Sequence, residues 1–345
     1  MRRIARFPLG KRRFGMEETM EINLLILSAG TRNKVVQYFK RELAGKGRVY
    51  ATDCSSLAPA LYEADEAILV PRITEPGYLD RILSICREKR ITGVLSLIDP
   101  ELTLLARHRE EFLAVGTTPI ISPLEAVEAS FDKFWMYQKL CELGIPAGRC
   151  FMGVEAFERA LAAGEVKLPV FVKPAKGSAS IGISRADTLE AVRFLCGCQE
   201  DMMIQEYMDG TEYGADVYVD MLTKRVTSIF VKEKLKMRAG ETDKSVSVKD
   251  ERLLSLIKNF VETVGFCGII DIDIFRRGDE YCISEVNPRF GGGYPHAYEC
   301  GVNVPAQIIR NLEGEANEER IGAYEEGICM MKYNEIMIRR RQEEL

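Results

Sequence analysis

The chain has 345 residues, of which 46% are hydrophobic and 29% are charged, and this composition predicts a folded protein with room for two or three domains. Its net charge of −5 argues against a general nucleic-acid-binding protein, because phosphate binding needs a basic excess or a concentrated basic stripe. No segment reaches the roughly eighteen apolar residues of a membrane span, so we expect no membrane association.

Cysteines and histidines narrow the chemistry further. The ten cysteines are scattered without any C-x-x-C pair, which is typical of reduced thiols and predicts a cytoplasmic protein. With two histidines in the whole chain, a histidine-rich metal site or a Ser-His-Asp triad is not expected. Residues 1–20 carry six basic residues without the apolar stretch of a secretory signal, and we expect them to form a disordered extension.

Residues 21–128 predict a Rossmann-like α/β domain. The G-x-G-x-x-G fingerprint is absent, so a dinucleotide is disfavoured, and Asp53 fits a helix cap better than a ribose ligand. Apolar strands alternate with helices as in a parallel sheet, with strands at 22–28, 48–53, 66–70 and 93–97 and helices near 34–43 and 77–89. Candidate substrate contacts lie where strands end, namely Ser28, Thr31, Arg32, Asp99 and Glu101.

Near residue 130 the pattern changes. A helix is predicted to open at Ser130 and to run through Leu143, capped by Ser130 or Asp132. Lys133 lies in its first turn, where a surface position is the simplest interpretation. Gly144 and a proline two residues later end the helix.

The next strand, 168–174, ends in a lysine and runs into a loop of small and hydroxyl residues at 175–182. A lysine beside loop amides can bind phosphate, although a plain hairpin turn explains the loop equally well. The sequence G-x-x-x-x-G-K-[ST] occurs nowhere, so a nucleotide site here belongs to an architecture other than the P-loop. The candidate phosphate contacts are Lys173, Lys176, Ser178 and Ser180.

An extended hinge follows the strand at 201–208. Glu206, Tyr207 and Met208 offer the backbone carbonyl and amide that an adenine edge requires, and Glu212 is placed to hold ribose hydroxyls. Residues 231–248 are densely charged, and they form either a solvated face or a set of cations that closes over phosphates. Those cations are Lys232, Lys234, Arg238 and Lys244. A helix is expected at about 251–264.

Residues 268–303 predict a two-stranded hairpin that leads into a glycine-rich loop. Polar and apolar residues alternate with the period of a strand, so one face is aliphatic and the other polar. A turn centred near Asp279 places Asp273 opposite Glu285 and Asp271 opposite Asn287.

This arrangement gathers three carboxylates and an amide oxygen. Opposed carboxylates destabilise a strand pair unless a cation neutralises them, and oxygen ligands suit magnesium or manganese. The alternative is the solvated face of an antiparallel sheet. Arg289 and Gly291-Gly292-Gly293 follow, and they offer a guanidinium and free amides to an anion, which favours the metal and phosphate interpretation.

Taken together, these motifs resemble the ATP-grasp superfamily, in particular short-form relatives of the carbamoyl phosphate synthase large subunit, over about residues 21–315. No single motif is specific, but six occur in order. They are Asp132-Lys133, VKP at 172–174, GSASIGI at 177–183, QEYMDGTEY at 205–213, KEKLKMRAGE at 232–241 and SEVNPRFGGGYP at 284–295.

The resemblance implies a Rossmann-like pre-ATP-grasp domain followed by a two-subdomain ATP-grasp fold, of mixed α/β and α+β class. The expected divisions are the pre-ATP-grasp domain at 21–128, the lid subdomain with its preceding helix at 129–204, the catalytic sheet subdomain at 205–315 and a C-terminal segment at 316–345.

The resemblance also implies residue roles. Lys133 and Lys173 would contact ATP phosphates, and Glu206 and Met208 would present backbone groups to adenine. Glu212 would hold ribose. Asp273, Glu285 and Asn287 would carry one or two Mg²⁺ or Mn²⁺ ions, although many family members have glutamine or glutamate at the position of Asp273. Arg289 would stabilise the transferring phosphoryl group, and we group Lys173 and Arg238 with it as catalytic candidates.

The implied activity is an ATP-dependent ligase that joins a small-molecule carboxylate to an amine through an acyl phosphate. Carboxyphosphate or carbamate chemistry, a phosphotransferase that stops at the phosphoryl step, and an ATP-binding subunit without turnover are the alternatives. Small-molecule carboxylate and amine substrates are the expected partners, and a homodimer is left open.

Overall fold

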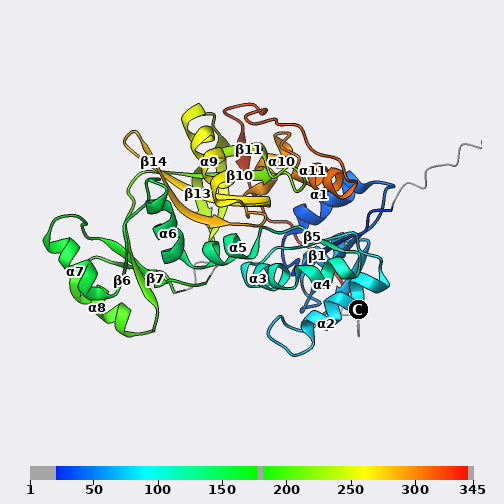
Figure 1. Cartoon of the computed structure of the whole chain (residues 1–345), viewed down its shortest axis with the longest axis horizontal. Helices are drawn as coiled ribbons and strands as arrows, with labels where there is room; N and C mark the ends of the chain where they lie inside the picture. Colours follow the sequence, from blue (N-terminus) through cyan, green and yellow to red (C-terminus); the bar gives the residue numbers. More distant parts are fainter. Residues whose placement is uncertain (1–20, 178–181, 341–345) are drawn as a thin grey trace, which may run out of the picture.

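The computed structural model describes residues 21–177 and 182–340, and it contains three β-sheets that follow one another along the chain (Figure 1). The N-terminal extension expected at 1–20, and the two phosphate candidates Ser178 and Ser180, lie outside the described residues. The three sheets confirm the mixed fold class that the motifs predicted.

The first sheet is parallel and has five strands in the order β3-β2-β1-β4-β5. Every residue of β1, the sequence LLIL, is buried, which explains its continuous apolar run. The strands are β1 (Leu24–Leu27), β2 (Val49–Asp53), β3 (Glu66–Leu69), β4 (Gly93–Ser96) and β5 (Thr118–Pro119). The helices are α1 (Asn33–Leu43), η1 (Pro59–Glu63), α2 (Tyr78–Glu88), α3 (Asp99–Arg107) and α4 (Arg109–Ala114). The strand order reverses between β1 and β4, where open α/β sheets bind ligands.

The helix predicted to open at Ser130 is two helices. Ser130 lies inside α5 (Leu124–Phe131), and its hydroxyl donates to the carbonyl of Ala126, so the prediction of Ser130 as a cap was wrong. Asp132 has an extended backbone, and its side chain accepts from the amide of Trp135 at 3.0 Å. Asp132 therefore ends α5 and caps α6 (Lys133–Glu142), which fixes Lys133 at the first position of a helix.

A small antiparallel sheet in the order β6-β9-β7-β8 forms the lobe at the lower left of Figure 1. Its strands are β6 (Cys150–Met152), β7 (Val170–Pro174), β8 (Ser184–Ala186) and β9 (Met202–Glu206), and its helices are α7 (Val154–Ala162) and α8 (Leu189–Gly197). The lobe has its own hydrophobic core, which includes Phe157, Val170, Val172 and Ile204. A separate core of this kind allows the lobe to move as a unit.

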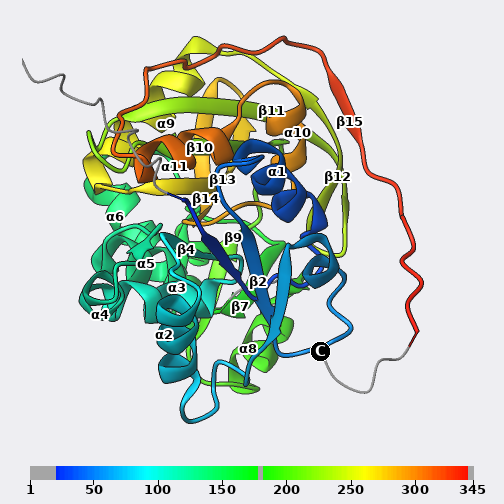
Figure 2. The ribbon, with the colours of Figure 1, turned by 90° about the vertical axis from the view of Figure 1, so that its right-hand side faces the viewer.

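The third sheet is antiparallel, with six strands in the order β14-β13-β10-β11-β12-β15. The strands are β10 (Thr211–Val219), β11 (Val226–Arg238), β12 (Glu241–Ser247), β13 (Gly268–Arg277), β14 (Glu280–Asn287) and β15 (Cys329–Met331). Its aliphatic face packs on α9 (Glu251–Val264), which spans the range expected from the sequence. Figure 2 shows β15 paired along the outer edge of β12.

One hydrophobic core joins the first and third sheets. Tyr38 and Phe39 of α1 pack against Phe290 and against residues of α10 (Tyr294–Glu299) and α11 (Val304–Leu312). The loops at the carboxyl ends of β1 and β4 are thereby held against the glycine-rich loop. Among the described residues, no helix combines the length and the apolar character needed to cross a membrane.

Candidate active site

The hairpin formed by β13 and β14 has the register that its alternating pattern predicted. Asp273 pairs with Glu285 and Asp271 pairs with Asn287, while Gly278 and Asp279 form the turn. The tight turn is possible because Gly278 adopts a positive φ of 58°. Three carboxylates and an amide therefore lie on the polar face of two neighbouring strands, as expected.

The neighbouring strands extend this polar face. Lys234 of β11 contacts both Glu212 of β10, at 2.8 Å, and Asp273, at 2.6 Å, and its side chain is only 4% exposed. Burial raises the pKa of Asp273 to about 7, with the nearby carboxylates Asp271 and Glu285 adding to the rise and Lys234 opposing it. Asp273 therefore lies in a crowded set of like charges that a single lysine partly neutralises.

The donor set fits a hard divalent cation. Asp273 and Glu285 offer carboxylate oxygens and Asn287 an amide oxygen, whereas no cluster of three His, Cys, Asp or Glu residues in the described ranges could hold a metal by itself. Magnesium keeps much of its shell for water and substrate phosphates, so two carboxylates and one amide suffice for a nucleotide-dependent site.

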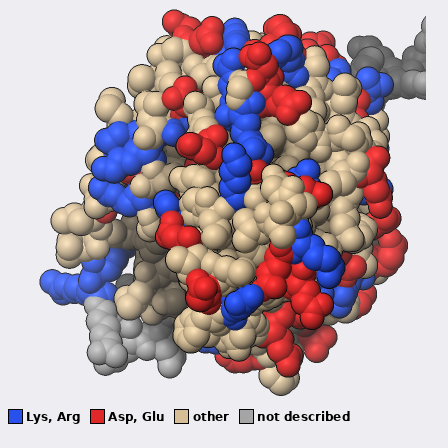
Figure 3. Space-filling view, turned by 90° about the vertical axis from the view of Figure 1, so that its left-hand side faces the viewer, with Lys and Arg blue, Asp and Glu red and all other residues tan. Residues whose placement is uncertain are grey.

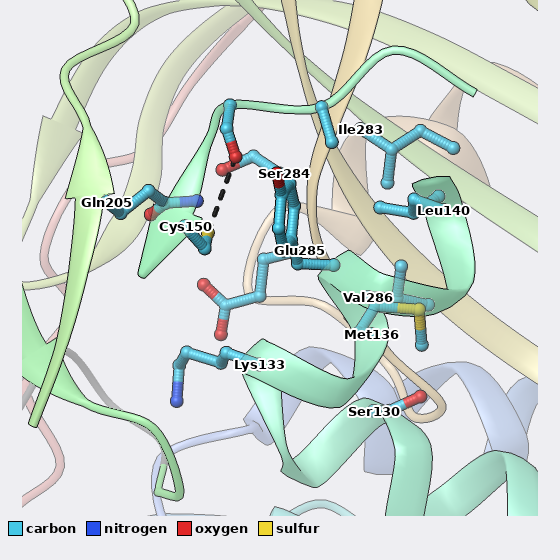
Figure 4. A pocket seen from close by; sticks show the side chains of 13 residues that line it. Ser130, Lys133, Met136, Leu140, Cys150, Gln205, Ile283, Ser284, Glu285 and Val286 are labelled. Atoms are coloured by element: carbon cyan, nitrogen blue, oxygen red, sulfur yellow. Dashed lines mark hydrogen bonds between the residues drawn. The ribbon is translucent and has the colours of Figure 1, made fainter. Parts of the chain in front are cut away.

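Two lysines face this cluster from the other side. Lys133 lies at the start of α6, and its ammonium donates to the carbonyl of Gly177. Figure 4 shows the carboxylate of Glu285 pointing toward the side of the cavity on which Lys133 lies. Burial lowers the pKa of Lys133, while Glu285 raises it and the charge of Lys173 lowers it further. Lys173, at the end of β7, is 6% exposed. A buried lysine, Lys173, and a half-buried one, Lys133, thus lie on the side of the cluster formed by α6 and β7.

The cavity in Figure 4 lies between α6, the small sheet and β14. Its apolar lining comes from Met136, Leu140, Ile283 and Val286, and Gln205 supplies a polar edge. The free volume is about 10 Å³, which is room for roughly one water molecule.

The hinge residues have separate contacts. The amide of Glu206 donates to the carbonyl of Arg149 at 2.8 Å, and its carboxylate accepts from Arg277 at 3.0 Å. The ring of Tyr207 packs 5.5 Å from that of Phe171. The amide of Glu206 is therefore engaged within the small sheet, and the backbone contacts with adenine expected of Glu206 and Met208 stay predictions.

Arg289 is held by two aspartates. Its Nε donates to Asp99 at 3.1 Å and its Nη1 to Asp271 at 3.2 Å. Burial works to lower the pKa of the guanidinium, but the charges of Asp99 and Asp271 outweigh it and raise the pKa above its ordinary value. Asp99 is the first residue of α3, at the carboxyl end of β4, so the first sheet takes part in positioning Arg289.

The three glycines that follow have a packing role that sequence reasoning missed. A Cβ on Gly291 would lie 2.4 Å from the carboxyl group of Asp271, and one on Gly293 would lie 2.6 Å from Cε of Lys232. Larger residues would displace these charged groups. Lys232 forms an ion pair with Asp216 in which both side chains are almost wholly buried.

Other predicted contacts lie elsewhere. Arg238 is at the exposed end of β11, where its Nη1 donates to Asn334 at 3.3 Å. Lys176 is exposed and lies 3.7 Å from Asp132. Glu101 is fully buried and accepts from Tyr78 and Ser96, so a contact with substrate is excluded in this arrangement.

Asp53 does not cap a helix, contrary to the prediction. Its two carboxylate oxygens accept from the amides of Gly30 and Ser55, each at 2.9 Å, which fixes the loop after β1. Ser28 has a positive φ of 49° in the same loop. The pattern missed this because an Asx-type contact and a helix cap use the same residue types.

Figure 3 shows the end of the molecule at which the small sheet lies, where acidic and basic side chains are interspersed. Two ion pairs of that lobe lie at its surface, Arg149 with Glu165 and Arg193 with the half-buried Glu158, both at 2.7 Å. Exposed pairs contribute little to stability.

Two family models match the chain. Residues 24–120 match the N-terminal domain of PylC-like proteins, and residues 198–336 match the ATP-grasp domain of a biosynthetic pathway found with the Ter operon.

Similar sequences include an uncharacterized protein, y4rH, of Sinorhizobium fredii, which is 25% identical over 78% of this chain and 58% of its own length. A carbamoyl-phosphate synthase of Methanobrevibacter smithii is 24% identical over 81% of this chain and 77% of its own. The chain spans only 24% of the similar carbamoyl phosphate synthase large chain of Rubrobacter xylanophilus.

Solved structures share the fold. The biotin carboxylase domain dimer of Hydrogenobacter thermophilus 2-oxoglutarate carboxylase, in complex with MgADP, ADP and bicarbonate, superposes with a TM-score of 0.71 at 18% identity, covering 90% of this chain and 73% of that one. An L-amino acid ligase from Bacillus licheniformis gives a TM-score of 0.65 at 18% identity, covering 87% and 75%.

Proposed function

We propose that the chain is an ATP-dependent ligase of the ATP-grasp superfamily, which joins a small-molecule carboxylate to an amine or similar nucleophile with release of ADP and phosphate. The observation that carries this proposal is the meeting of opposite charges at one place. Glu285 and Asp273 face each other on the hairpin, Lys133 and Lys173 approach from the α6 and β7 side, and Arg289 lies beyond them.

These groups are of the kinds that phosphoryl transfer requires. Ammonium and guanidinium groups offset the negative charge that spreads over the γ-phosphate oxygens, and catalysis of this type depends on positioning and electrostatics. Asp273, Glu285 and Asn287 would hold magnesium, which supplies charge neutralisation at the phosphate oxygens. Lys133 and Lys173 would bind phosphates, with Met208 and Glu206 at adenine and Glu212 at ribose.

The chemical step would be attack by a carboxylate oxygen of the substrate on the γ-phosphorus. The bond from that phosphorus to the bridging oxygen of ADP breaks, and an acyl phosphate forms. The amine then attacks the acyl carbon, phosphate leaves, and the nitrogen loses a proton. No side chain needs to form a covalent bond. The small sheet would close over the site to exclude water, which would otherwise hydrolyse the acyl phosphate.

Carbamoyl phosphate synthase-like chemistry is the second candidate, because several similar sequences carry that name. In that case bicarbonate would take the place of the organic carboxylate and carboxyphosphate that of the acyl phosphate. The shared site residues would perform the same phosphoryl transfer.

Homodimer formation and a cytoplasmic location are further proposals. The dimer draws support from the structural neighbour that is itself described as a dimer. The location draws support from the ten cysteines, all of which are free thiols in the structure.

The deciding experiment incubates the purified chain with MgATP and pools of amino acids and other carboxylates, and follows ADP and product mass. An amide product would support ligation, whereas ADP formed only with bicarbonate would favour the second candidate. A phosphorylated carboxylate or alcohol without condensation would point to a phosphotransferase. ATP binding without ADP formation under any condition would contradict both enzymatic proposals.

A further inference from the structure

The C-terminal segment supplies a charged side chain to the region beside the glycine-rich loop. Lys332, directly after β15, contacts Oε2 of Glu241 at 2.8 Å. The other oxygen of Glu241, Oε1, contacts Nη1 of Arg32 at 2.9 Å. We call these three residues the relay. They come from the C-terminal segment, the start of β12 and the residue before α1, so three distant parts of the chain meet here.

The relay packs directly on the glycine-rich loop. A Cβ on Gly292 would lie 2.7 Å from Cδ of Glu241 and 2.8 Å from Nη1 of Arg32. Arg32 also lies near Arg289: burial lowers the pKa of Arg32, and the charge of Arg289 lowers it further while Glu241 opposes the change. The two guanidinium groups therefore belong to one region, at the carboxyl ends of β1 and β4.

The backbone fixes Lys332 in this position. Its amide donates to the carbonyl of Asp243 at 2.9 Å, and Met331 pairs with Lys244 across β12 and β15. Figure 2 shows the chain continuing along the outer side of the molecule, and Arg339 reaches the ring of Tyr62 at 4.8 Å. The segment is thus attached to β12 and to the N-terminal sheet domain on either side of the relay.

The charges of the relay do not cancel. Although burial acts to raise the pKa of Glu241, Arg32 and Lys332 outweigh it, so the group is ionised at neutral pH. One carboxylate is then shared between two cations. If Lys332 were neutral, Glu241 would be free to pair with Arg32 alone, and Arg32 would be less available to an anion.

We propose that Lys332 is a positioning residue, which acts through Glu241 so that Arg32 can bind an anionic group of the acceptor substrate. By acceptor we mean the small-molecule substrate other than ATP that binds at this place. The inference rests on the proposed function, because it places the acceptor at the carboxyl ends of β1 and β4. The acceptor class that this arrangement recognises is a small molecule with a carboxylate or phosphate in addition to its reacting group.

The first test needs neither substrate nor nucleotide. Hydrogen exchange is measured on the full chain and on the variants Lys332→Met, Lys332→Arg and Glu241→Gln. Lys258→Met, which removes an ion pair with Glu319 at 2.7 Å, is the matched control. We expect Glu241→Gln to accelerate exchange at residues 291–294 and 32–36 by roughly threefold or more, because Arg32 loses its anionic partner. Lys332→Met should instead slow exchange at residues 32–36, because Glu241 then pairs with Arg32 alone, and Lys332→Arg and Lys258→Met should stay close to wild type. Changes confined to residues 329–333 would overturn the relay.

The second test separates acceptor binding from nucleotide binding. ADP release from MgATP is titrated with a pool of the twenty amino acids, and the Kd of MgADP is measured alongside. We expect Lys332→Met to raise the half-saturating pool concentration roughly tenfold, with kcat within about twofold and the MgADP Kd unchanged. Lys332→Arg should restore the wild-type value. The proposal would be overturned if Lys332→Met lowered kcat or the affinity for MgADP and left the half-saturating pool concentration unchanged.

A double-mutant cycle identifies the route of the effect. If Lys332 acts through Arg32, the double variant Arg32→Met/Lys332→Met should have the same half-saturating pool concentration as Arg32→Met alone. Additive effects would show that Lys332 acts independently, and would overturn the relay. Failure of the wild-type chain to bind MgADP would instead overturn the proposed function, so the two failures are distinguishable.

Discussion

Arg289 donates its Nε hydrogen to Asp99 at 3.1 Å, between residues that are 190 positions apart in the chain. Asp99 belongs to the domain of the parallel sheet and Arg289 to the loop after β14. Both side chains are less than 15% exposed. The proposed phosphoryl-binding arginine is therefore oriented by a residue outside the sheet that carries the acidic hairpin.

Replacement of Asp99 by asparagine should weaken this orientation. We expect Asp99→Asn to lower kcat for ADP release about tenfold or more and to reduce the free energy of unfolding by about 1–3 kcal/mol, because a buried guanidinium loses one of two anionic partners. Initial rates and urea unfolding measure the two effects. Asp209→Asn, at an exposed position, is the control. Unchanged values for both quantities in Asp99→Asn would contradict a positioning role.

Glu285→Gln should abolish most ADP formation and leave the fold intact. The amide keeps the size of the side chain but removes the negative charge that would hold the metal, so a loss of about 10²–10³-fold in kcat is expected. Glu280→Gln changes an exposed residue at the start of the same strand and should retain full activity. Normal turnover in Glu285→Gln would remove the hairpin from the mechanism.

The three lysines predicted to contact phosphates should differ in importance. Lys133→Met and Lys173→Met are expected to weaken MgATP binding by roughly ten- to a hundredfold, since Lys173 is buried and Lys133 is half-buried and close enough to Glu285 for that charge to act to raise its pKa. Lys176→Met should change the Kd less than about threefold, because its side chain is 62% exposed. Calorimetric titration measures the Kd of MgATP for each variant. A change in Kd for Lys176→Met as large as those for Lys133→Met and Lys173→Met would contradict this prediction.

His296 should make stability depend on pH. Burial lowers the pKa of His296 from 6.5 to about 4, with Lys232 adding to the change. Between these two pH values the unfolded chain binds a proton at this histidine that the folded chain does not bind. The contribution of His296 to the free energy of unfolding is therefore fully present above about pH 6.5 and is lost as the pH falls toward 4. The full loss is on the order of 3 kcal/mol.

The contribution of His296 is isolated by comparing wild type with His296→Gln in urea unfolding at pH 7 and pH 5. The difference in free energy of unfolding between the two proteins should be smaller at pH 5 than at pH 7, because only the wild type loses the contribution of the histidine. The comparison of differences is needed because burial raises the pKa of Asp216 to about 6, which acts in the opposite sense over part of this range. A gap that stays constant would exclude this role.

Local patterns determined much of the site in advance. The facing pairs Asp273 with Glu285 and Asp271 with Asn287 follow from period-two alternation and a short turn, which together leave one register that buries the aliphatic face. The glycine-rich loop, the lysine that ends β7 and the cap at Asp132 are likewise encoded within a few residues. Such features depend on near neighbours, so the sequence alone is sufficient to predict them.

The partners of those groups were decided only by the tertiary structure. Nothing near Arg289 in the chain indicates Asp99, nothing near Glu241 indicates Arg32 or Lys332, and Lys234 reaches Asp273 only because β10 lies between their strands. These ion pairs form where separately folded sheets and a C-terminal strand pack together. Their geometry depends on the shape and packing of whole layers, which no short stretch of residues specifies.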